Sequence, residues 1–217
     1  MIVCDPKSVW YLTGVAVEPY ERLLALYLPT EGKPVLFLNR LFNVPEPPCR
    51  TVWHTDTDKP VAQIAGVVDA GKPLGIDKEW PAKFLIPLME THPGMQVVLS
   101  SDCVDDCRAC KDAEEQALMR EASRINDAVN EAAKHYIKAG MTEREVAEFI
   151  DAQFRAHGCE GPSFTTIVSF GANAADPHHE PDDTVLKEGD CVLFDMGCGE
   201  GPLLQRHDPH LVLRPAH

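Results

Sequence analysis

Two side chains in the C-terminal half of the chain could take part in chemistry, a carboxylate and an imidazole. Asp195 ends the apolar run that begins at Val192, and Gly197 follows shortly after it. His178 lies seventeen residues upstream, in a stretch with Pro and Asp on both sides. A carboxylate at the end of a buried strand is costly unless it is paired or binds a cation. Asp195 is therefore a candidate metal ligand, and the alternative is a carboxylate that caps the turn before Gly197.

The residues around these two side chains resemble a known family. Residues 162–181 read Pro-Ser-Phe-Thr-Thr-Ile-Val-Ser-Phe-Gly-Ala-Asn-Ala-Ala-Asp-Pro-His-His-Glu-Pro, and residues 186–197 end in Phe-Asp-Met-Gly. This order resembles the prolidase and aminopeptidase P branch of the pita-bread metallopeptidases, and the resemblance extends from Met1 to about Gly197. It implies an α/β creatinase/prolidase-type N-terminal domain, followed by the first part of an α+β pita-bread catalytic domain.

The resemblance also implies a reaction. Members of the family hold two divalent ions (Mn, Co or Zn) with two Asp, one His and two Glu, and hydrolyse the bond before proline in peptides. Asp195 matches the first Asp of this set, and His178 matches the histidine that contacts the substrate. His179 and Glu180 are interpreted as ordinary loop residues. Relatives form homodimers, so a homodimer is a further implication. A non-catalytic binding module and a creatinase-like C–N hydrolase are the two alternative functions.

The sequence departs from the family after Asp195. The family places its second Asp eleven residues after the first, within Ser-Asp-x-Thr-Arg-Thr, and this chain has Arg206 there. With suitable third bases, the codons of residues 201–210 read one nucleotide later spell Gly-Arg-Tyr-Cys-Ser-Asp-Met-Thr-Arg-Thr. We therefore interpret residues 199–217 as an out-of-frame tail, and we expect the chain as written to lack metal ions and activity.

Three cysteines form a second pattern. Cys103, Cys107 and Cys110 have the Cys-x-x-x-Cys-x-x-Cys spacing of radical-SAM iron–sulfur sites. Such a site would begin a barrel and have a Gly-rich companion segment, whereas here the cysteines precede a long helix. We favour a cysteine-containing linker and helix start.

Several elements are expected to position these residues. Short apolar runs predict strands at 23–28, 34–38, 74–77 and 96–99, and helices are predicted at 60–68 and 82–90. A long amphipathic helix carries Leu118 to Tyr136, and a capping box at Thr142 and Glu145 begins the next helix. We expect one domain at residues 1–105 and a second at 106–217.

Composition limits the partners and the compartment. The net charge of -14 argues against nucleic acid or an anionic membrane as a partner. The N-terminal residues show no signal-peptide pattern, and eight cysteines without such a signal indicate reduced thiols. The expected compartment is the cytoplasm.

Overall fold

The structure is a computed structural model that describes residues 1–199. The described chain divides into two compact units that meet between Lys111 and Asp112, and each is described by itself. The boundary expected near residue 105 falls inside a helix that belongs to the first unit.

The first unit is built on a six-stranded mixed sheet with the order β4-β3-β2-β1-β5-β6. Its strands are β1 (Ile2–Val3), β2 (Ala25–Tyr27), β3 (Val35–Asn39), β4 (Arg50–His54), β5 (Leu74–Ile76) and β6 (Val97–Leu99). The central strand β1 runs antiparallel to β2 and parallel to β5. The very short β1 is therefore the strand that joins the two halves of the sheet.

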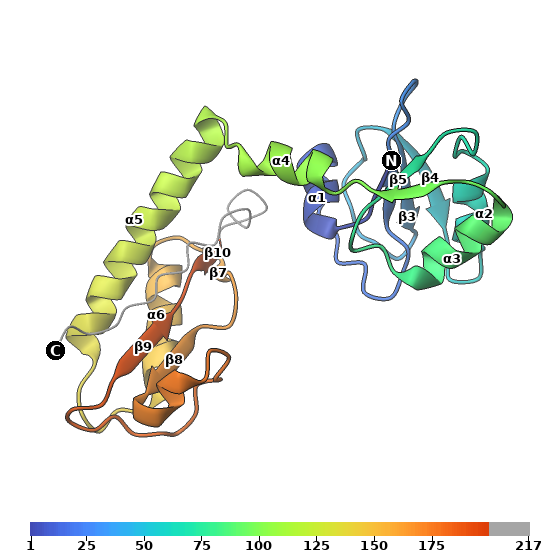
Figure 1. Cartoon of the computed structure of the whole chain (residues 1–217). Coiled ribbons are helices and arrows are strands. Elements are labelled where there is room, and N and C mark those ends of the chain that lie inside the picture. Colours follow the sequence, from blue (N-terminus) through green and yellow to red (C-terminus); the bar gives the residue numbers. More distant parts are fainter. Residues whose placement is uncertain (200–217) are drawn as a thin grey trace. The chain divides into compact units, whose positions relative to one another are not determined.

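Helices cover both faces of this sheet. The helices α1 (Pro6–Thr13) and α4 (Asp102–Ala109) lie on one face, and α2 (Pro60–Ala65) and α3 (Ala82–Thr91) lie on the other (Figure 1). Alternate residues of β3 serve the two cores, because Phe37 packs with the α2 side and Leu38 with the α1 side. The unit is thus a three-layer α/β/α sandwich with two apolar cores.

The second unit pairs two helices with a β-hairpin. It contains α5 (Ala113–Tyr136), α6 (Glu143–Ala156), β7 (Gly161–Pro162), β8 (Ile167–Phe170), the 3-10 helix η1 (Gly171–Ala175), β9 (Val192–Asp195) and β10 (Cys198–Gly199). The apolar stripes of α5 and α6, with Val129 and Phe154 fully buried, pack against β8 and β9 in one core. Capping boxes begin both helices, at Asp112 and at Thr142.

The α/β and α+β classes predicted from the sequence are confirmed, but several elements were missed. Among those not assigned are α1, β4 and α4 in the first unit and β7, η1 and β10 in the second. Cys103 and Cys107 lie within α4 rather than in a linker, and Cys110 directly follows the helix. All three thiols are free and exposed. Among residues 1–199, no helix has the length and apolar character that crossing a membrane requires.

Candidate active-site loop and hairpin

Asp195 occupies the end of the antiparallel β8–β9 ladder, where it pairs with Ile167. Val192 and Phe194 belong to the core with α5 and α6, so the alternating residues Leu193 and Asp195 point to the opposite face of the hairpin. The carboxylate is half-buried there. Asp195 therefore ends the strand, as the sequence predicted. The structure adds that its side chain lies on the face that the helices α5 and α6 leave uncovered.

Gly197 lets the chain pass close to its neighbours just after Asp195. A Cβ atom at this position would lie 2.7 Å from Ser163 Oγ and 3.0 Å from Phe164 Cε1. The amide of Ser163 donates to the carbonyl of Gly197 at 2.9 Å, which holds the two segments together. The lack of space for a Cβ atom, rather than an unusual backbone conformation, explains the glycine in Asp-Met-Gly.

His178 lies on the long connection between β8 and β9 and is exposed. Its amide donates to Asp176 Oδ1 at 2.9 Å, so the backbone at His178 is fixed by a local turn. The connection leaves the ladder at the pair Phe170–Val192, whereas Asp195 lies at the other end. The ladder ends are three residues apart, or about 10 Å along the strand. The connection that carries His178 thus leaves the hairpin at the end opposite to Asp195.

The base of the His178 connection is held by a buried carboxylate that the sequence analysis missed. Glu143, the first residue of α6, has a side chain with no exposed surface. Its Oε1 accepts from Phe170 N at 2.7 Å and from Asn173 Nδ2 at 3.0 Å. Its Oε2 accepts from His179 Nε2 at 2.7 Å and from Asp182 N at 3.2 Å. We call Glu143 and these four donors the Glu143 clamp.

Glu143 had a signal in the sequence. It lies three residues before Val146, on the same stripe as Ile150 and Phe154, so a charged residue stands at a position that helical periodicity assigns to the core. A buried acid requires partners, and the polar residues of the following connection are the ones that supply them. His179, interpreted from the sequence as an ordinary loop residue, is one of these partners and is therefore structurally important.

The described residues do not supply a two-metal centre. Asp195 is the one metal ligand that the sequence analysis predicted, and Arg206, with the rest of the tail, lies outside the described residues. Among residues 1–199, one group of side chains brings three metal-ligating atoms within 4.8 Å of one another, namely Glu143, His179 and Asp182. Four donors already use the Glu143 oxygens, and the Thr184 side chain and amide lower the pKa of Asp182 by hydrogen bonding. This group therefore fits a hydrogen-bonded network better than a metal ion.

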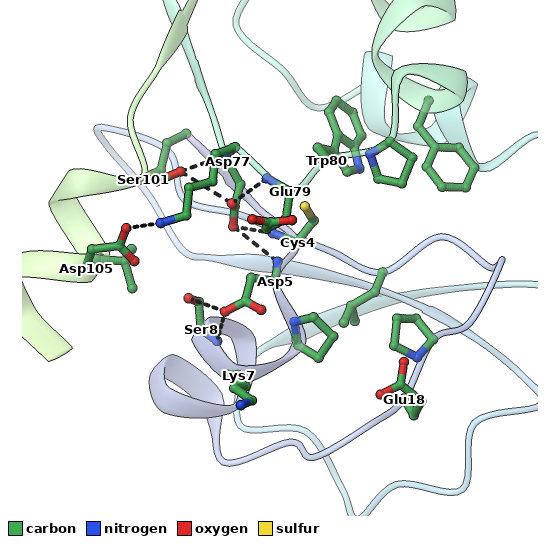
Figure 2. Close-up of a pocket in the computed structure, with 18 of the residues that line it drawn as sticks. Cys4, Asp5, Lys7, Ser8, Glu18, Asp77, Glu79, Trp80, Ser101 and Asp105 are labelled. Atoms are coloured by element: carbon green, nitrogen blue, oxygen red, sulfur yellow. Dashed lines mark hydrogen bonds and ion pairs between the residues drawn. The ribbon is translucent and has the colours of Figure 1, made fainter. Parts of the chain in front are cut away.

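A separate cavity of about 450 Å³ lies in the first unit. Figure 2 shows the buried Asp77 on its wall, where Asp77 accepts from the amides of Cys4, Asp5 and Glu79, each at 3.1 Å. These bonds connect the end of β1 to the turn after β5. Asp77 therefore has a structural role, because it satisfies backbone donors at the sheet edge.

The thiol that lines this cavity is not activated. Burial, followed by the negative charge of Asp77, raises the pKa of the Cys4 thiol. A nucleophilic cysteine needs the opposite shift, because the thiolate is the reactive form. Neither His178 nor Asp195 lines the cavity, so it lies outside the site that the sequence predicted.

The two units match two known sequence families. Residues 1–110 match the creatinase/prolidase N-terminal domain, and residues 117–200 match metallopeptidase family M24. An uncharacterized peptidase of Staphylococcus aureus is 32% identical over 206 residues, which are 90% of this chain and 56% of that protein. The chain therefore spans little more than half the length of this relative.

Solved structures of similar folds agree. Dipeptidase PepE from Mycobacterium ulcerans matches with a TM-score of 0.81 and 29% identity, over 93% of this chain and 56% of its own. A prolidase from Thermococcus sibiricus matches with a TM-score of 0.79 and 28% identity, over 92% of this chain and 56% of its own. Both neighbours thus resemble this chain across its two units, with 44% of their own length unmatched.

Proposed function

The chain belongs to the metallopeptidase family M24 with a creatinase/prolidase N-terminal domain, and we propose that its function derives from an Xaa-Pro peptidase of the prolidase or aminopeptidase P type. Solved relatives with 28–29% identity carry the names prolidase and dipeptidase. The observation that carries the proposal is the hairpin β8–β9, with Asp195 at the end of one strand and the exposed His178 on its connection.

In this proposal the two residues have different roles. Asp195 is one ligand of the dinuclear metal centre of the parent enzyme, and its place on the face of the hairpin away from the helices supports this role. His178 contacts the substrate, where its imidazole can donate a hydrogen bond to the carbonyl oxygen of the bond before proline. Proline-containing peptides are the proposed substrates.

We propose further that a polypeptide of these 217 residues alone is inactive. Among the described residues, Asp195 is the one ligand at a family position, and one carboxylate does not hold a pair of ions. The position of the second family Asp is Arg206, whose guanidinium repels cations. The cytoplasmic location and the homodimer predicted from the sequence belong to the same proposal.

Two assays test the proposal. The 217-residue polypeptide should release no proline from Xaa-Pro dipeptides in the presence of Mn²⁺, Co²⁺ or Zn²⁺, and metal-dependent turnover would show that the ligand argument is wrong. The gene with the reading frame restored after Cys198 should encode an enzyme that does release proline. In that enzyme His178→Ala should lower kcat by about 10²–10³, the cost of losing one donor to a developing oxyanion. Hydrolysis of creatine instead would favour the C–N hydrolase.

A further inference from the structure

The Glu143 clamp has an unusual composition for a structural network. One fully buried carboxylate takes donors from both sides of His178, from Phe170 at the start of the connection and from Asp182 about halfway along it. Two side chains from within the connection, Asn173 and His179, complete the set. The carboxylate therefore closes the first half of the connection into a loop, and we call residues 171–181 the His178 loop.

The geometry fixes the protonation of His179. Its Nε2 lies 2.7 Å from Glu143 Oε2, and each oxygen of this carboxyl group already accepts a backbone N–H, from Phe170 or from Asp182, so we assign the proton of this contact to Nε2. Asn173 Nδ2 lies 3.1 Å from the same nitrogen, but it has acceptors of its own in Glu143 Oε1 at 3.0 Å and Thr184 Oγ1 at 3.2 Å. All donors of the clamp thus point to acceptors, and the network is satisfied without a metal ion.

The clamp also determines where His178 stands. His179 is its direct neighbour and is anchored to Glu143, while the amide of His178 itself donates to Asp176 Oδ1. Asp176 is in turn tied to the 3-10 helix, because its amide donates to the carbonyl of Asn173 at 3.0 Å. Two anchored neighbours leave the backbone of His178 little freedom, although its side chain is exposed.

We propose that Glu143 is the positioning residue for His178 and acts through the Nε2-protonated imidazole of His179. The charged carboxylate, rather than a metal ion, keeps the His178 loop in the arrangement that presents His178 to a substrate. The role of His178 rests on the proposed function, whereas the clamp is a property of the polypeptide and is measured without any activity.

Hydrogen exchange followed by NMR on the 217-residue chain tests the clamp. In Glu143→Gln the side-chain NH2 group faces N–H donors of the clamp that formerly met a carboxylate oxygen. We expect the exchange of the amides of Phe170, Asp182 and the His178 loop to accelerate about tenfold to a hundredfold, as the loss of charge-assisted hydrogen bonds predicts. Glu148→Gln is the matched control, because Glu148 lies on the exposed side of the same helix and should leave these rates unchanged.

The same samples separate positioning from general stability. The ¹³Cε1–¹H relaxation of His178 should show a more mobile ring in Glu143→Gln, with amide exchange in α5 and in the core of β9 unchanged. Equal acceleration throughout the second unit would mean that Glu143 only stabilises the fold, and the proposal would fail.

A measurement on the unmodified chain protects the test against a variant that does not fold. Long-range ¹H–¹⁵N spectra should show His179 protonated at Nε2, and a neutral ring protonated at Nδ1 would overturn the proposal. Added Mn²⁺ should leave the amide signals of Phe170 and Asp182 sharp. Selective broadening of these signals would mark a metal site in place of the clamp. If the clamp is intact but His178→Ala leaves kcat of the frame-restored enzyme unchanged, that result would count against the proposed function alone.

Discussion

The close approach at Gly197 gives a prediction whose size follows from two distances. In Gly197→Ala the new Cβ would stand 2.7 Å from Ser163 Oγ and 3.0 Å from Phe164 Cε1, and both atoms lie closer than ordinary van der Waals contact allows. Either the segment at Ser163 or the strand end at Asp195 must therefore move.

Two effects oppose each other in this substitution. Overpacking of a well-packed site costs about 1–3 kcal/mol. Replacing glycine by alanine stabilises the folded state by about 0.4–1 kcal/mol, because alanine lowers the conformational entropy of the unfolded chain. This gain applies at Gly197 because its φ does not lie in the left-handed region. We expect a net loss of about 0.5–2 kcal/mol in the free energy of unfolding of the second unit. Ser163→Ala removes the nearest atom, so the double variant should recover about 1 kcal/mol.

The chain contains its own reporters for this measurement. Trp10, Trp53 and Trp80 all lie in the first unit, so tryptophan fluorescence during urea unfolding follows that unit. The long helices α5 and α6 dominate the far-ultraviolet circular dichroism of the second unit. Gly197→Ala should lower the urea midpoint seen by dichroism and leave the fluorescence midpoint unchanged.

Gly161→Ala is the matched control, because it lies in the same unit and a Cβ there would meet nothing within 4 Å. This control should be neutral or slightly stabilising. Equal midpoints for Gly197→Ala and Gly161→Ala would refute the steric reasoning. An additive double variant with Ser163→Ala would show that the Oγ atom is not the obstacle.

Three further predictions concern the gene, the helix start and the thiols. Sequencing of codons 201–210 should spell Gly-Arg-Tyr-Cys-Ser-Asp-Met-Thr-Arg-Thr in the next frame, and any other reading would end the frameshift hypothesis. Thr142→Ala should destabilise the second unit by about 1 kcal/mol through the lost N-cap, as measured by urea unfolding. Hydrogen bonds from the Thr142 amide and hydroxyl lower the pKa of Glu145. The Glu145 side chain should therefore stabilise the cap fully above the pKa that Glu145 has in the unfolded chain, and this stabilisation should fade as the pH falls through the lower pKa of the folded state. A thiol reagent should label four cysteines rapidly in the folded protein and the buried ones only on unfolding; the four are Cys103, Cys107, Cys110 and Cys191.

The parts of the fold that the sequence revealed are those with a local signal. The capping box at Thr142 was read correctly because its two partners stand three residues apart, and the helix that follows has a regular apolar stripe. Asp195 was placed correctly at a strand end because an apolar run leads into it. The helix α4 escaped notice because Asp and Cys dominate its surface and Val104 is its single buried residue.

The site could be predicted only in part, for a related reason. His178 and Asp195 came from a motif that is continuous in the sequence, and their roles stay predictions. Glu143 belongs to the same loop in space but precedes Phe170 by 27 residues. Acidic residues in the first turn of a helix usually serve the helix dipole at the surface, so the position of Glu143 on the apolar stripe hinted at burial but did not identify its partners. Only the folded arrangement reveals the four donors.

The separation of the Glu143 clamp from the family's metal ligands has an evolutionary consequence. Every member of the clamp is encoded between Glu143 and Asp182, which are 39 positions apart in the sequence. Substitutions or frameshifts that remove ligands downstream of Gly197 leave this segment untouched. The His178 loop and the proposed metal centre would thus decay at different rates in related genes. In lineages that lose the metal ligands, Glu143 and His179 should persist for as long as the loop serves folding, and His178 should be the first of the three to drift.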